Sequence, residues 1–98
     1  MRDQQILEQV KSTLALLTVK APGRAIEVRV PPYAAVQCGD GPTHTRGTPP
    51  NTIEMSADTW LALASGKLSW ADAMSSGAIA ASGVRADLTE YLPLGSEL

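Results

Sequence analysis

The spacing of apolar residues changes twice along this chain, and the two changes limit the folds open to it. In the first twenty positions apolar side chains recur on one side of a helical wheel, which predicts an amphipathic helix over residues 3–18 capped by Asp3. Residues 26–30 alternate apolar and charged side chains, as in a strand with one buried face. From Ser56 the helical spacing returns. This order predicts a single α+β domain, residues 1–98.

Prolines and glycines divide the middle of the chain into short strands. Pro31 and Pro32 cannot donate a hydrogen bond to a strand ladder, so the first strand ends there or lies at a sheet edge. The further expected elements are a strand over residues 33–38, a turn at 39–42, a more polar strand over 43–47 that completes a hairpin, and a short strand over 51–55.

Capping residues mark the helices of the second half. Ser56 can cap a helix that ends at Gly66, where a left-handed C-cap would fall. Ser69, with Asp72 three residues later, predicts a second short helix that ends before Gly77. The remaining elements are a strand of small residues over 78–82 and a last helix from residue 87 to residue 93.

Charge and composition exclude several classes of function. The formal charge is -2 and the basic residues are scattered, so nucleic acid is not an expected partner. No apolar run approaches the roughly 20 residues of a membrane-spanning helix, and we expect a cytoplasmic protein. Cys38 is the single cysteine, so neither an intrachain disulfide nor a cysteine-based metal site can form. We expect no metal and no cofactor.

A resemblance to a known family rests on the segment SADTWLALASGKLSWADAMSSGAIAASGVRADLTEYLPL, residues 56–94. It has a helix that ends in Gly66-Lys67, a Ser76-Gly77 pair before a strand, and Gly83 before the last helix. This pattern resembles the C-terminal half of the sterol carrier protein family. The run VRVPPYAAVQCGDGPTHTRGTPPN is similar to the bacterial branch of carrier-like domains.

The resemblance implies a sterol-carrier-like fold, a mixed and mostly antiparallel sheet of four to five strands with helices packed on one face. It also implies a small non-catalytic module that holds a lipid, or another apolar or amphipathic ligand of the acyl type, between sheet and helices. The residues expected to line that ligand are Trp60, Leu61, Leu63, Met74, Ile79, Leu88, Tyr91 and Leu92. The alternative is that the same side chains fill a closed core.

Two polar side chains of the expected hairpin are candidates for the polar end of such a site. His44 and Arg46 project to one face of a strand, where they could hold a carboxylate or phosphate head group, or simply be solvated. Catalysis by Cys38 with His44 as its base is disfavoured, because an apolar strand buries the thiol. The chain is therefore not expected to be an enzyme.

A second hypothesis assumes the same fold but no small-molecule ligand. Carrier-like domains also occur fused to mycothiol-dependent isomerase-type enzymes, so the chain could be an interaction or accessory protein. Its partner would be a second copy of itself, in a homodimer, or an enzyme.

Overall fold

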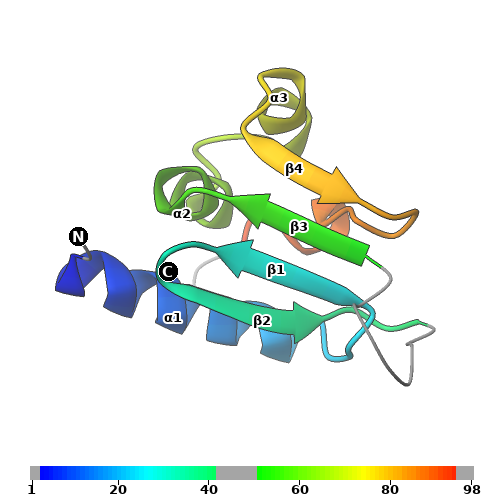
Figure 1. The fold of residues 1–98 in the computed structure, drawn as a ribbon, viewed down its shortest axis with the longest axis horizontal. Coiled ribbons are helices and arrows are strands. Elements are labelled where there is room, and N and C mark those ends of the chain that lie inside the picture. Colours follow the sequence, from blue (N-terminus) through cyan, green and yellow to red (C-terminus); the bar gives the residue numbers. More distant parts are fainter. Residues whose placement is uncertain (1–2, 42–50, 95–98) are drawn as a thin grey trace.

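The computed structural model describes residues 3–41 and 51–94. Its elements, in chain order, are α1 (Gln4–Lys20), β1 (Ile26–Val30), β2 (Ala34–Cys38), β3 (Asn51–Met55), α2 (Ala57–Ser65), α3 (Trp70–Ser75), β4 (Ile79–Ser82) and the 3-10 turn η1 (Thr89–Tyr91) (Figure 1). Within this part of the chain the strands form one sheet with the order β2-β1-β3-β4. The predicted α+β class is confirmed.

Strand β1 lies inside the sheet and pairs with neighbours of opposite sense. It runs antiparallel to β2, with Val28 opposite Val36, and parallel to β3, with Val28 opposite Ile53. Strand β4 then pairs antiparallel with β3. The sheet is therefore mixed and mostly antiparallel, with four strands in the described residues, as the resemblance implied. Strand β1 therefore ends before Pro31, as predicted. The alternative prediction, that this strand lies at a sheet edge, is wrong.

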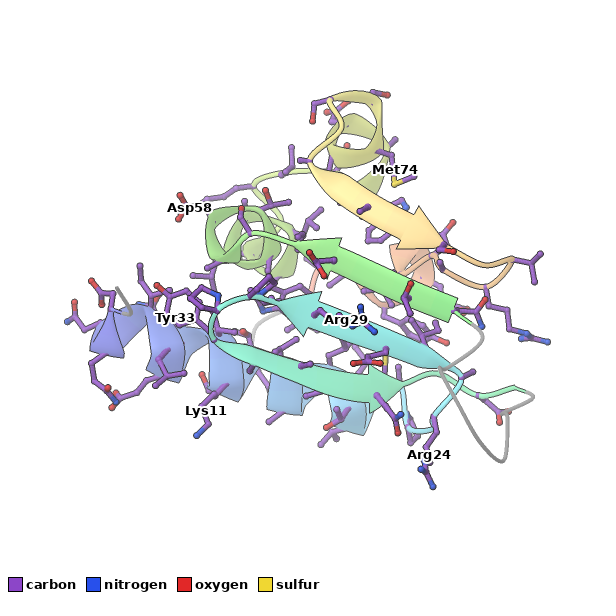
Figure 2. All side chains as sticks on the ribbon, in the orientation of Figure 1. Lys11, Arg24, Arg29, Tyr33, Asp58 and Met74 are labelled. Atoms are coloured by element: carbon purple, nitrogen blue, oxygen red, sulfur yellow. The ribbon has the colours of Figure 1, made fainter. Side chains whose placement is uncertain are left out.

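The two faces of the sheet differ in polarity. Val28 and Ile53 point to the inner face and are fully buried. Arg29 lies on the outer face (Figure 2) and pairs with Glu27 at 3.2 Å. Glu54, opposite Arg29 in the β1–β3 register, is exposed. Alternation of apolar and polar side chains along each strand produces this difference. The helices pack on the apolar face.

Local capping fixes the ends of the helices as the sequence predicted. The Asp3 carboxylate accepts a hydrogen bond from the Ile6 N–H at 3.1 Å and begins α1. Ser56 and Ser69 accept in the same way from the N–H groups three residues later, at 3.2 and 3.1 Å. Gly66 ends α2 with a φ of 85°, a left-handed conformation that costs glycine little. All four predicted caps are confirmed.

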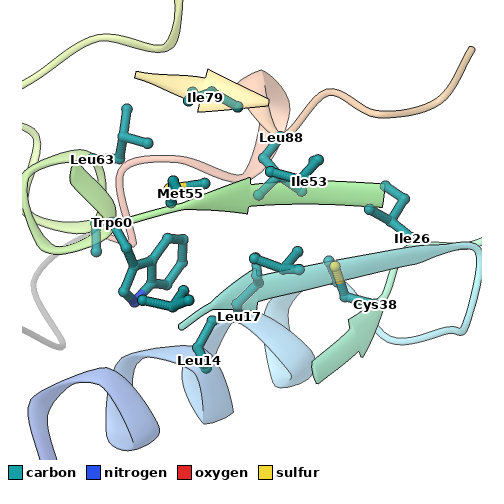
Figure 3. Close-up of a cluster of buried hydrophobic side chains, with 14 of the residues drawn as sticks. Leu14, Leu17, Ile26, Cys38, Ile53, Met55, Trp60, Leu63, Ile79 and Leu88 are labelled. Atoms are coloured by element: carbon teal, nitrogen blue, oxygen red, sulfur yellow. The ribbon is translucent and has the colours of Figure 1, made fainter. Parts of the chain in front are cut away.

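The core lies between the sheet and helices α1 and α2. Figure 3 shows Trp60 of α2 reaching toward Leu14 and Leu17 of α1, and all three are fully buried. The indole Nε1–H of Trp60 donates to the Thr13 hydroxyl at 2.7 Å, so its one polar group is satisfied inside the core. Aliphatic side chains fill the rest of this interior.

The predicted last helix is wrong, since the chain forms only the short turn η1. The Asp87 carboxylate accepts from the Thr89 N–H at 2.8 Å, which starts a turn as expected. Pro93 follows so closely that Leu92 adopts an extended conformation, with φ -111° and ψ 147°. A residue before proline avoids the helical region, so one turn is all that fits.

One predicted helix is longer in the structure, and one predicted strand lies outside the described residues. Helix α1 continues to Lys20, two residues beyond its predicted end. The predicted strand over residues 43–47, with His44 and Arg46, lies outside the described residues. Within residues 3–41 and 51–94, no helix combines the length and apolar character that a membrane crossing needs.

Candidate functional site

The eight residues expected to line a ligand do not surround one space. Trp60, Leu63, Ile79 and Leu88 belong to the packed core, while Leu61, Tyr91 and Leu92 are half-buried around it. Met74 lies on α3 with 43% of its surface exposed (Figure 2). Their role in ligand binding stays a prediction.

An open groove runs between α1 and α2, with a volume of about 630 Å³. We call it the α1–α2 groove; its lining residues are Gln9, Ser12, Thr13, Leu16, Leu61, Ala64, Ser65 and Lys67. Pockets for small molecules commonly have volumes of about 300–1,000 Å³, so the groove is large enough for one. Leu61 is the predicted residue that it contains.

Helical spacing explains why these side chains share the groove. The α1 residues Gln9, Thr13 and Leu16 recur at intervals of four and three, so they form one stripe on that helix. Leu61 and Ala64 form the matching stripe on α2. From Gln9 to Leu16 the stripe is about 10 Å long, at 1.5 Å per residue.

The floor of the groove is held by the hydrogen bond between the two helices. Thr13 lines the groove and receives the Trp60 indole N–H, while its own hydroxyl proton is donated to the Gln9 carbonyl at 2.6 Å. Since Trp60 is fully buried, this contact links α1 and α2 beneath the groove.

Most hydroxyl protons in the groove are already used by the helices. The Ser12 hydroxyl donates to the Gln9 carbonyl at 3.2 Å, and the Ser65 hydroxyl donates to the Ala62 carbonyl at 3.3 Å. A hydroxyl has one proton to give, so these groups offer a ligand acceptors and no donor. The groove therefore combines an apolar stripe with few free donors.

The residues after η1 close one end of the molecule. The Leu94 N–H donates to the Ala64 carbonyl at 2.9 Å, and the Lys20 ammonium donates to the Pro93 carbonyl at 2.9 Å. A side chain added at Gly66 would meet the Pro93 ring at 3.4 Å. This segment, residues 92–94, spans from the end of α1 to the end of α2, and we call it the C-terminal strap.

A second depression, with a volume of about 400 Å³, lies beside the end of β2. Its lining residues are Ile26, Gly39, Asp40, Arg85, Asp87, Thr89, Glu90 and Tyr91. Arg85 is tied to the chain around it, because its N–H donates to the Asn51 side chain at 2.9 Å and its guanidinium to the Asp40 carbonyl at 3.4 Å. Partial burial, and then the neighbouring Glu90 carboxylate, raise the pKa of Tyr91. With three carboxylates and one guanidinium, this depression is unfavourable for an anion.

Cys38 lines neither of these two depressions, and its thiol is unreactive. Its side chain is fully buried, and burial raises the pKa of the thiol to about 11. The thiol is therefore protonated at neutral pH, and a protonated thiol is a poor nucleophile. Among the described residues, no group of three or more His, Cys, Asp or Glu side chains is placed to hold a metal ion.

Sequence reasoning missed the α1 half of the groove. The sequence places Ser12 on the side of the first helix away from its apolar residues, and nothing local shows that α2 packs beside Gln9 and Ser12. The available signal was the interval pattern of Gln9, Ser12, Thr13 and Leu16, in which small and polar residues border one leucine.

The mixed sheet, the helices on its apolar face and the groove between α1 and α2 define a small α+β domain of the sterol carrier type. Residues 2–94 match the family described as bacterial SCP ortholog, and the chain belongs to that family. The suspected relationship to bacterial sterol carrier proteins is confirmed. A comparison with curated proteins gives no match.

Proposed function

We propose that this protein is a carrier module that holds one amphipathic small molecule in the α1–α2 groove. The observation that supports it best is the groove itself, about 630 Å³ with Leu16, Leu61 and Ala64 forming an apolar stripe between polar rims. An acyl or other alkyl tail lies along that stripe, and the head group lies at an end. No chemical step is part of the proposal.

The packed core argues for a ligand between the helices and not beneath them. Trp60, Leu63 and Leu88 leave no more than 1% of their surfaces exposed, and they fill the layer between sheet and helices. A tail placed there would have to displace side chains packed at the density of an organic crystal. The groove needs no such displacement. Its ligand is therefore half-exposed and has a single narrow tail.

The test is binding of three alkyl probes with the same tail, dodecanol, dodecanoate and dodecylammonium, each below its micelle-forming concentration. Titration calorimetry measures the dissociation constants, and amide chemical shifts locate the bound probe. We expect saturable binding of dodecanol with shifts on the groove faces of α1 and α2. Failure of all three probes to bind, or shifts confined to other elements, contradicts the proposal.

Two variants link binding to the groove. Leu61→Gln puts an amide into the apolar stripe, and we expect it to weaken dodecanol binding about tenfold, since burying a polar group without a partner costs about 1–3 kcal/mol. Val19→Gln is the matched control, because Val19 is on α1, is 79% exposed and does not line the groove. Equal binding by the two variants contradicts the proposal.

The second hypothesis, an interaction or accessory protein, gives a different result in the same experiment. It predicts that none of the three probes binds. It also predicts that sedimentation equilibrium shows a constant assembly, either of two copies or with an enzyme from the host.

A further inference from the structure

We propose that Lys67 makes the α1–α2 groove selective for amphipaths with an anionic head group, with the ammonium group of Lys67 as the head-group contact. This inference rests on the proposed function, because it assigns a specificity-determining residue to the same groove. Its ligand class is an alkyl chain with one carboxylate or a comparable oxyanion.

The charges that line the groove are of one sign. Lys67 is the one charged residue among the eight lining residues, so no carboxylate of residues 3–41 and 51–94 lines the groove. An anion at this position gains attraction without repulsion from a neighbouring acid. A cationic head group would meet the Lys67 ammonium with no carboxylate to offset it.

Lys67 is also the main donor that the groove has left. The hydroxyls of Ser12, Thr13 and Ser65 give their protons to helix carbonyls. What remains is the Gln9 amide and the three N–H bonds of the Lys67 ammonium. A carboxylate accepts hydrogen bonds and offers none, so it matches this lining better than an alcohol, and its bonds to an ammonium are charge-assisted.

The backbone places Lys67 at the end of the groove, and its side chain is exposed. Its N–H donates to the Ala62 carbonyl at 2.9 Å, directly after the left-handed turn at Gly66. Within residues 3–41 and 51–94 the ion pair that forms is Arg29 with Glu27, so Lys67 is not held by a carboxylate there. Lys20, by contrast, is engaged with the Pro93 carbonyl.

The second depression cannot take the same ligand, which makes the assignment specific to one site. Asp40, Asp87 and Glu90 line it together with a single guanidinium, that of Arg85. An alkyl carboxylate is repelled there. The two depressions therefore have opposite charge preferences, and of the two the α1–α2 groove favours an anionic amphipath.

The experiment compares dodecanoate with dodecanol in the native protein and in Lys67→Met, Lys67→Arg and Lys11→Met. Lys67→Met keeps a flexible chain of similar length and removes the charge. Lys11→Met is the matched control, since Lys11 is exposed on the side of α1 opposite the groove (Figure 2). We expect the native protein and Lys11→Met to bind dodecanoate about fivefold tighter than dodecanol, as an exposed ion pair allows.

The charge change should act mainly on the anion. In Lys67→Met the ratio of the dodecanol to the dodecanoate dissociation constant falls from about five to about one, and Lys67→Arg restores the preference. Raising the ionic strength should reduce the native preference, since salt screens exposed charges.

The experiment distinguishes failure of the role of Lys67 from failure of the carrier function. Dodecanol binding in the groove with no preference for dodecanoate, or a preference that persists in Lys67→Met, overturns the role of Lys67 and leaves the carrier function standing. Absence of binding by dodecanol and by dodecanoate overturns both proposals.

Discussion

At the scale of single residues, Cys38 shows how completely this small domain encloses its interior. It ends β2 opposite Ile26, and its side chain has no exposed surface. The thiolate is therefore deprived of water, and its formation is unfavourable in the folded chain. The pKa of the thiol rises from 9.0 to about 11 because of that burial.

The raised pKa predicts a loss of stability in alkaline solution. Below pH 9 both folded and unfolded chains keep the proton, and the stabilisation is fully present. Between about pH 9 and 11 the unfolded chain releases the proton while the folded chain keeps it, so the free energy of unfolding falls as pH rises. Between pH 9 and about pH 10.5 the fall attributable to Cys38 is about 2 kcal/mol, since one pKa unit corresponds to about 1.4 kcal/mol.

Urea unfolding at a series of pH values from 8 to about 10.5 measures this effect. Cys38→Ala is the control, since it removes the thiol and keeps every other titrating group, Tyr91 included. The difference in unfolding free energy between the two proteins should shrink steadily above pH 9. A difference that does not change with pH contradicts the prediction.

At the scale of elements, the pair α1 and α2 carries both the core and the groove. The contact from Trp60 to Thr13 joins positions 47 residues apart, and it satisfies a buried N–H that has no other partner among the described residues. The same threonine lines the groove. The spacing of the two helices, and with it the width of the groove, depends on this contact.

Replacing Thr13 by valine tests that contact, because valine has nearly the same shape and no hydroxyl. We expect Thr13→Val to lower the free energy of unfolding by about 1–3 kcal/mol, since the indole N–H is then buried without a partner. Thr18→Val is the matched control. The Thr18 hydroxyl also donates to a carbonyl of its own helix, at 2.7 Å, but among the described residues it makes no hydrogen bond to α2.

Thermal or urea unfolding of both variants supplies the comparison. Thr18→Val should stay within about 0.5 kcal/mol of the native protein. If the two variants are destabilised equally, the Trp60 contact adds nothing beyond the local helix bond.

Elements were predictable from sequence where the deciding contacts are local. Asp3, Ser56 and Ser69 cap their helices with side chains that reach three residues along the chain, so their spacing was sufficient. The last helix failed because Pro93 leaves room for a single turn. The groove could not be predicted, since Thr13 and Leu61 become neighbours only when two helices from opposite halves of the chain pack together.

At the scale of the whole molecule, the fold is closed by its C-terminal strap. Leu94 is 2% exposed and donates its N–H to Ala64 of α2, while Pro93 accepts from Lys20 of α1. The parallel pair of β1 and β3 adds further contacts between distant segments. No large part of the described chain is complete without the rest.

Leu94→Ala should therefore destabilise the domain as a whole. Removing a buried leucine side chain costs about 2–5 kcal/mol, and we expect a value in the lower half of that range because the strap lies at the edge of the core. Val84→Ala, at a fully exposed position, is the control and should change stability very little. Hydrogen exchange gives the second readout: amides of α1 and β1 should lose protection together in Leu94→Ala. Loss confined to the strap contradicts the expectation.

The bond between Lys20 and Pro93 also concerns the growing chain on the ribosome. It joins residues 73 positions apart, and at a synthesis rate of about 5–20 residues per second the second partner is made about 4–15 s after the first. The apolar side of α1, with Val10, Leu14 and Leu17, lacks the strap during the whole of that interval. It lacks Trp60 during the first part of the interval. The nascent helix thus exposes an apolar surface of the kind that chaperones protect, before it becomes a wall of the groove.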